Sequence, residues 1–273
     1  IYEFQTVDIC DRESKTQFIR EKGEILAKKY PKMKAKKIPV LPQIAYVEDV
    51  EFELKGLDCV PIGIEKNSLE VYVYNFLEHK INLIAAKSLK NHIYFIYALI
   101  KQMISLKDVN VHVVDAMSIY RGDYPEIDVF ADDLEKAFVS MYKSVQNDKS
   151  SKIKNVYLCI GVSEFKKRVS SKYGEHFEKL FKEAEKCKNT TFLFFDDSDG
   201  YKHIQTENWY KENINNTFGI WLGEDIGVQV ALGVMSLSME DRQTVFPCIG
   251  YPIYQGKHMT VKYVVDGVDK NDE

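Results

Sequence analysis

The sequence predicts an α/β fold with a mainly parallel central sheet flanked by helices. Short, almost continuously apolar stretches recur along the chain after residue 60, and amphipathic stretches lie between several of them. Apolar strands separated by helices are typical of a parallel sheet with both faces covered, because parallel neighbours need a crossover connection. With 273 residues, of which 45% are hydrophobic, the chain is long enough to bury a sizeable core.

Each element is expected from its own pattern. The first is a helix over 13–30, because apolar residues from Phe18 to Leu26 are spaced for one helical face and Pro31 disfavours its continuation. Strands are expected at Val71–Phe76, Asn82–Ala86, Val109–Asp115, Val156–Ile160, Thr191–Phe195 and Phe218–Leu222. Further helices are expected at Tyr94–Met103, Asp132–Val145 and His176–Cys187.

The connection after the strand Asn82–Ala86 stands where a nucleotide-binding loop would lie. Such a loop reads G-x-x-x-x-G-K-[ST]: glycines let backbone amides surround phosphate, the lysine reaches the outer phosphates, and the hydroxyl holds Mg²⁺. Here alanine, asparagine, histidine and isoleucine take those places, within the stretch Ala86, Lys87, Ser88, Leu89, Lys90, Asn91, His92 and Ile93. The sequence therefore predicts a degenerate nucleotide loop and no catalytic residue.

A nucleotide-hydrolysing site also needs a carboxylate that positions Mg²⁺ at the end of a second apolar strand. The strand expected by order, Val156–Ile160, is followed by Gly161 instead. Asp196 and Asp197 follow the next strand and fit the apolar-then-acidic pattern, but a turn is the simpler interpretation of Asp-Asp-Ser-Asp-Gly. We expect no metal site, and Asp196 and Asp197 stand as an alternative.

The remaining composition excludes several classes. Five cysteines are scattered without a C-x-x-C pair, and the histidines lack metal-ligand spacing, so reduced cysteines and no metal are expected. A net charge of −4 argues against a nucleic-acid binder. No apolar run approaches the ~20 residues that cross a bilayer.

The first 45 residues are expected to form a helical arm and a proline-stiffened connector, and residues 46–273 the main domain. A basic segment over 32–37 is interpreted as a solvated linker, and the acidic tail over 266–273 as frayed. The chain opens with Ile1, so we expect it to be a piece of a longer protein.

Several motifs, taken in order, resemble one protein family. The connector Lys37-Ile38-Pro39-Val40-Leu41-Pro42 and the stretch Val60-Pro61-Ile62-Gly63-Ile64 are similar to segments of the FtsK/SpoIIIE-type ATPase modules of type VII secretion coupling proteins, the EccC/EssC group. Later motifs of that family are similar to Asn82–Ile84, Ala98–Met103 and Thr217–Leu222. The resemblance extends over nearly all of 37–265.

The resemblance implies a RecA-like P-loop NTPase fold. Because the loop positions and Gly161 depart from the family pattern, the chain is most similar to the degenerate carboxyl-terminal module of an EssC-type protein. Such modules stand in tandem behind a membrane anchor, at the cytoplasmic face of the bacterial cell membrane. The resemblance thus implies neighbouring ATPase modules and WXG100-like secreted substrates as partners, contact with the membrane only through the parent protein, and ATP and Mg²⁺ in the sister modules with no cofactor here.

Three alternatives stay open. In the first, Lys87 or Lys90 replaces the missing loop lysine and Asp196 holds Mg²⁺, which would make an atypical ATP-binding or hydrolysing motor module. In the second, the chain is a DNA-translocating module, against which its mild acidity argues. In the third, it is a structural spacer between other modules.

Overall fold

The computed structural model describes residues 12–29, 40–50, 52–122, 124–243 and 245–266. The expected basic segment, the first residues of the proline connector and most of the acidic tail lie outside these ranges. The chain divides into two compact units, Ile1–Val40 and Leu41–Glu273. The first unit contains the helix α1 (Arg12–Lys29), which confirms the helix expected over 13–30.

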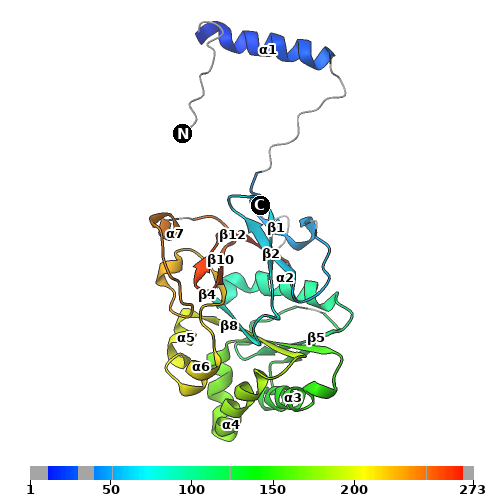
Figure 1. Ribbon diagram of the computed structural model, residues 1–273, viewed down its shortest axis with the longest axis vertical. Coiled ribbons are helices and arrows are strands. Elements are labelled where there is room, and N and C mark those ends of the chain that lie inside the picture. The colour runs from blue at the N-terminus through cyan, green and yellow to red at the C-terminus, as the bar shows by residue number, and fades with distance from the viewer. Residues whose placement is uncertain (1–11, 30–39, 51, 123, 244, 267–273) are drawn as a thin grey trace. The chain divides into compact units, whose positions relative to one another are not determined.

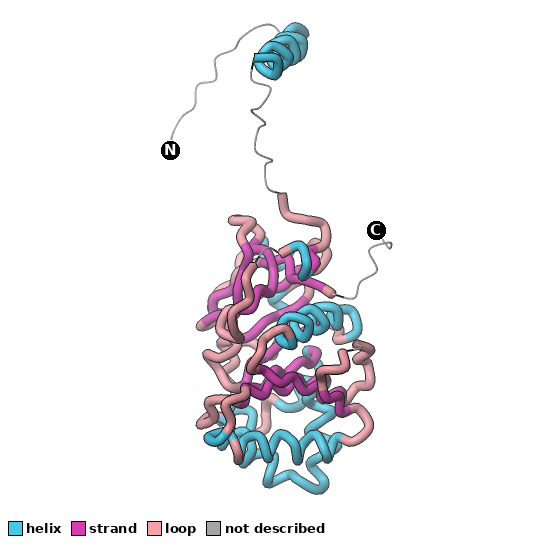
Figure 2. Tube along the Cα trace, turned by 90° about the vertical axis from the view of Figure 1, so that its right-hand side faces the viewer, coloured by secondary structure: helices cyan, strands magenta, loops and turns pink. Residues whose placement is uncertain are grey.

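The second unit is built on a 12-stranded sheet with helices on both faces (Figures 1 and 2). Its strand order is β3-β2-β12-β10-β9-β4-β8-β7-β5-β6, with β1 beside β12 and β11 beside β10. Neighbours from β9 to β6 are parallel, and neighbours from β3 to β9 are antiparallel. The strands are β1 (Ala45–Tyr46), β2 (Val60–Glu65), β3 (Val71–Tyr74), β4 (Ile81–Ala86), β5 (Val109–Asp115), β6 (Asp128–Phe130), β7 (Lys154–Ile160), β8 (Thr190–Asp197), β9 (Gly219–Leu222), β10 (Ile249–Tyr254), β11 (Lys257–His258) and β12 (Val261–Val265).

Helices cover the sheet and connect its strands. In the described part of this unit they are α2 (Ile93–Ile104), α3 (Leu134–Gln146), α4 (Val162–Ala184), α5 (Ser198–Ile204), α6 (Asn208–Asn213) and α7 (Met239–Gln243). Short 3-10 turns lie at η1 (Val47–Asp49), η2 (Lys90–His92), η3 (Asp148–Ser150) and η4 (Ile226–Val228). Across all the described residues, no helix combines the length and the apolar character that crossing a membrane requires.

The predicted α/β class with a mainly parallel sheet is confirmed. Each expected strand is present, as β3, β4, β5, β7, β8 and β9, and the expected helices correspond to α2, α3 and α4. The expected start of α4 at His176 is wrong, because the helix already begins at Val162. Three serines and Gly174 lower the helix propensity of the stretch in between, and the helix kinks at Tyr173, where φ is −124°.

The antiparallel part of the sheet was not expected from the sequence. Proline and glycine interrupt the apolar pattern of two of its strands, VPIGIE in β2 and IGYPIY in β10. The backbone requires Gly63, because a Cβ there would lie 2.5 Å from the carbonyl oxygen of Lys262 on β12. These residues favour a turn by local pattern, and only pairing with neighbouring strands makes them part of the sheet.

Most of the core of the described residues belongs to two apolar clusters, one on each face of the sheet, and a small third cluster contains Ala45, Ala98 and Val264. On β8, Phe192 and Phe194 belong to the cluster under α3 and α4, whereas Leu193 and Phe195 belong to the cluster under α2. This alternation follows from strand geometry, since successive side chains point to opposite faces. Both faces of β8 are therefore buried, which is why its sequence is apolar at every one of these positions.

Candidate functional site

The candidate site lies where β4 ends and α2 begins. β4 ends at Ala86 and α2 begins at Ile93, and both residues are buried. A short connection and the turn η2 join them, which confirms the strand–loop–helix arrangement expected from the sequence. In open α/β sheets, ligands bind at the carboxyl ends of the strands, so the connection lies at the edge where a nucleotide would be expected.

The connection is closed by contacts within the chain. The Lys87 N–H donates to the Leu222 carbonyl oxygen of β9 at 3.1 Å, and the His92 N–H donates to the Leu89 carbonyl oxygen at 3.2 Å. Leu89 is 5% exposed and packs in the apolar cluster under α2. A phosphate cradle needs several free amides that converge on one point. Here two amides of the connection already have acceptors in the protein.

His92 stands at the position of the loop lysine and is held by a tyrosine. Its Nδ1 lies 2.8 Å from the hydroxyl of Tyr263 on β12. Burial, helped by the positive charge of Lys87, lowers the pKa of His92 to about 4. A Cβ at Gly223 would lie 3.4 Å from His92 Nε2, so the chain after β9 passes close to the other ring nitrogen. His92 is therefore neutral at pH 7 and supplies no positive charge for phosphate.

The two lysines of the connection lie at its surface. The Nζ atom of Lys87 is 3.7 Å from the carboxylate of Glu224, and both side chains are largely exposed. An exposed pair of this kind holds a side chain only weakly. Lys90 and Asn91 are exposed and Ser88 is half-buried. Lys87 and Lys90, the two candidate cations of the alternative nucleotide site, are thus both at the surface of the connection.

Asp196 lies one strand from the connection, because β8 is the direct neighbour of β4. Its side chain is 2% exposed, and its carboxylate accepts hydrogen bonds from the N–H of Ser163 at 2.8 Å and of Asp197 at 2.9 Å. A Cβ at Gly200 would lie 2.3 Å from the Asp196 Oδ1 atom, so α5 closes over the same group. Burial raises the pKa of Asp196, whereas the two backbone donors favour its charged form.

Asp197 begins the helix α5 rather than a turn. Strand β8 continues through Asp197, whose carboxylate accepts a hydrogen bond from the Gly200 N–H at 2.8 Å and caps α5. The expected turn over Asp-Asp-Ser-Asp-Gly is therefore wrong, because the same polar residues also suit a helix N-terminus. Over the described residues, no group of three or more His, Cys, Asp and Glu side chains could hold a metal ion.

Gly161 occupies a backbone conformation that suits glycine. Its φ is +74°, it precedes the first turn of α4, and its N–H donates to the Phe195 carbonyl oxygen at 2.8 Å. A Cβ at this position would lie 2.4 Å from Cγ of Met117. An aspartate at Gly161 would need the left-handed region of backbone space and a shift of Met117.

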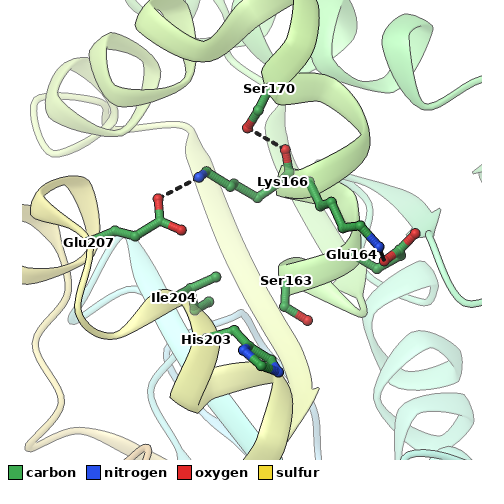
Figure 3. A pocket seen from close by; sticks show the side chains of 8 residues that line it. Ser163, Glu164, Lys166, Ser170, His203, Ile204 and Glu207 are labelled. Atoms are coloured by element: carbon green, nitrogen blue, oxygen red, sulfur yellow. Dashed lines mark hydrogen bonds and ion pairs between the residues drawn. The ribbon is translucent and has the colours of Figure 1, made fainter.

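A pocket of about 640 Å³ lies beside Asp196, between the first half of α4 and the segment α5–α6 (Figure 3). Buried Ile204 contributes an apolar surface, and charged side chains on the walls pair with one another. Lys166 Nζ lies 2.5 Å from the carboxylate of Glu207, and Lys167 Nζ lies 3.3 Å from that of Glu164. An apolar surface with paired charges around it suits an uncharged or amphipathic ligand better than a free anion.

Comparison with solved structures gives close overall matches. The cytoplasmic domain of EssC matches with a TM-score of 0.65 and 13% identity, over 95% of this chain and 55% of that chain. ATPases 2 and 3 of EssC from Geobacillus thermodenitrificans match with a TM-score of 0.66 and 14% identity, over 94% of this chain and 51% of theirs. The fold is that of the type VII secretion ATPase domains. The predicted RecA-like P-loop NTPase fold is thereby confirmed.

The same EssC-like fold occurs in Thermomonospora curvata EccC ATPases 2 and 3 in complex with a signal sequence peptide. That structure matches with a TM-score of 0.60 and 10% identity, over 94% of this chain and 50% of that chain. The chain spans about half the length of the EssC and EccC structures that contain two ATPase domains. No family model and no curated protein matches the sequence.

The sequence did not indicate the residues that close the site from other elements. Leu222 accepts from the connection, Tyr263 holds His92, and Ser163 donates to Asp196. None of these contacts has a signal in the sequence, because each joins strands or helices far apart along the chain. The apolar spacing of Val162, Phe165 and Val169 was the available signal for the first half of α4.

Proposed function

We propose that this chain is a non-hydrolysing, ATPase-like module of a type VII secretion motor. The observation that carries the proposal is the closed connection after β4, in which Lys87 and His92 donate their amides to the protein and Leu89 fills the space beneath. Neutral His92 takes the place of the lysine that would contact phosphate. The module then needs no nucleotide or Mg²⁺ of its own, and hydrolysis belongs to sister modules of the parent protein.

The expected effect on hydrolysis is large. Phosphoryl transfer depends almost entirely on positioning and on electrostatic stabilisation by the loop, its lysine and Mg²⁺. Losing one such preorganised donor lowers the rate by a factor of about 10²–10³. Here the glycines, the lysine and the hydroxyl are all replaced. The carboxylate of Asp196 already accepts a hydrogen bond from the Ser163 N–H in the first turn of α4.

The role that remains is docking. A signal sequence peptide is bound in the EccC structure with the same fold, so we propose that this module recognises WXG100-like secreted substrates or contacts neighbouring ATPase modules. The pocket beside α4 (Figure 3) is the proposed docking point, because the ion pairs on its walls and the apolar side chain of Ile204 suit an amphipathic segment. The module would act at the cytoplasmic face of the membrane, held there by the parent protein and without nucleic acid.

Calorimetric titration with Mg²⁺–ATP tests the first half of the proposal. The expected result is no phosphate release and no binding heat from the connection after β4, that is, none that Lys87→Gln with Lys90→Gln removes. Hydrolysis that Asp196→Asn abolishes would overturn it, because Asp196 would then position a metal. Circular dichroism of both proteins establishes that each is folded.

Titration with a synthetic peptide carrying a WXG100-like export signal tests the second half. Binding is expected, and Lys166→Glu should weaken it by reversing one charge on the pocket wall. Lys182→Glu, an exposed lysine in the second half of α4, is the matched control and should leave binding unchanged. Equal binding by both variants would place the peptide elsewhere.

A second candidate function is nucleotide binding without the usual loop. The exposed side chains of Lys87 and Lys90 beside the connection favour it. In that case Mg²⁺–ATP should bind, and Lys87→Gln together with Lys90→Gln should abolish the binding heat.

A further inference from the structure

A second pocket lies at the opposite end of the parallel strands from the connection after β4. It has a volume of about 500 Å³ and is formed by the starts of β5 and β7, the end of α2 and the segment before β2. The connection follows the last residue of β4, whereas this pocket is lined by Val109 and Lys154, the first residues of β5 and β7. Because these strands are parallel, the two places are at opposite edges of the sheet.

The pocket is lined by a cluster of lysines. Lys55, Lys107, Lys152 and Lys154 line it, and the one carboxylate among its lining residues is that of Asp108. Lys55 is 3.2 Å from the exposed carboxylate of Glu53. Within the described part of the chain, no ion pair joins the other three lysines to a carboxylate. Four positive charges and one negative charge thus line a single concave surface.

The lysines come from separate stretches of the chain, and the charge of one of them, Lys154, reaches a further lysine at the same edge. Lys80, just before β4 on the same edge, has its pKa lowered by burial and by the neighbouring charge of Lys154, although buried Asp148 acts in the opposite sense. A helix C-terminus attracts a cation, so the end of α2 accounts for Lys107. It does not account for Lys152, which precedes β7, or for Lys154, the first residue of β7. An anion in the pocket would offset this positive charge.

We infer that this pocket binds a phosphate group carrying two or more negative charges, as found in oligophosphates and phosphorylated headgroups. Its volume lies within the range of about 300–1,000 Å³ that small-ligand sites occupy. Lysine ammonium groups bind phosphate as point charges and do not need a glycine loop. The site is separate from the connection after β4, and the inference does not depend on the proposed docking role.

The test is calorimetric titration of the whole chain with inorganic pyrophosphate in low salt, without Mg²⁺. Binding is expected, and it should weaken as salt is raised because the lysines are largely exposed. The double substitution Lys107→Gln and Lys152→Gln should weaken binding about tenfold, from two lost charge contacts. Lys182→Gln with Lys211→Gln removes two exposed lysines elsewhere and should change nothing.

Vesicles separate the two sources of phosphate. If vesicles of phosphatidic acid, whose phosphomonoester headgroup can carry two negative charges, bind the unaltered chain but not the lysine variant, and pyrophosphate competes, then the ligand is a lipid headgroup. If pyrophosphate binds and neither phosphatidic acid nor phosphatidylcholine vesicles do, the ligand is a soluble phosphate. The inference is overturned if pyrophosphate fails to bind, or if the lysine variant and its control bind it equally.

The same variants keep this inference distinct from the proposed function. Heat from Mg²⁺–ATP that disappears in the Lys107→Gln and Lys152→Gln variant belongs to the lysine pocket. Heat that survives in that variant and disappears in Lys87→Gln with Lys90→Gln belongs to the connection after β4.

Discussion

Replacing His92 by glutamine is expected to reduce the loss of stability that the protein suffers between pH 7 and pH 5. His92 hydrogen-bonds Tyr263, and burial with the nearby charge of Lys87 lowers its pKa from 6.5 to about 4. Glutamine offers Tyr263 a hydrogen-bonding group but does not titrate. The substitution therefore removes the proton equilibrium and preserves a polar partner.

The magnitude follows from linkage. A folded pKa below the unfolded value means that the unfolded chain takes up a proton first, so stability falls as pH drops below 6.5 and the loss is complete below about pH 4. Between pH 7 and pH 5 the unfolded histidine becomes almost fully charged while the folded one stays mostly neutral. This difference costs about 2 kcal/mol of the free energy of unfolding.

Urea unfolding at the two pH values measures this effect. Fluorescence of Trp209 and Trp221 follows unfolding, because both side chains are buried. Other groups titrate too, so the quantity compared is the pH response of the unaltered chain minus that of His92→Gln. His203→Gln, at an exposed histidine, is the matched control. Equal pH responses of the unaltered chain and His92→Gln would refute the conclusion that His92 is held neutral.

Three further predictions concern stability and binding. Asp196→Ala should lower the free energy of unfolding by about 2 kcal/mol in urea titrations, because the Ser163 N–H loses its buried acceptor; an unchanged midpoint would contradict the stabilising role of this hydrogen bond. Trp209→Ala should cost about 3–5 kcal/mol, since the side chain is 1% exposed and packs on Phe177 with ring centroids 5.0 Å apart. Gly161→Asp should lower the free energy of unfolding by about 1–2 kcal/mol, because φ at this position is +74° and residues with a side chain disfavour that region. It should also leave the chain without phosphate release from Mg²⁺–ATP, and acquired hydrolysis would show that a single carboxylate restores the site.

The prediction of the elements around the candidate site succeeded because the evidence for them was local. The strand Asn82–Ala86, the helix that follows it and the missing loop residues could be read from adjacent letters, because apolar periodicity reports burial of each element directly. The assignment of the stretch Asp196–Gly200 to a turn failed because it also rested on local letters alone. The letters that favour a turn also favour a helix N-cap, and only the packing of α5 decides between them.

By itself the sequence determined the alternation of buried strands and amphipathic helices, and with it the α/β class and the residues after β4. Only the tertiary structure decided that β8 lies beside β4, that Leu222 and Tyr263 close the connection, and that an antiparallel extension joins β9. It also brought Lys55, Lys107 and Lys152 into one pocket. The physical reason is range: a side-chain pattern records which face of an element is buried, whereas strand order and shared pockets depend on packing between elements far apart in the chain.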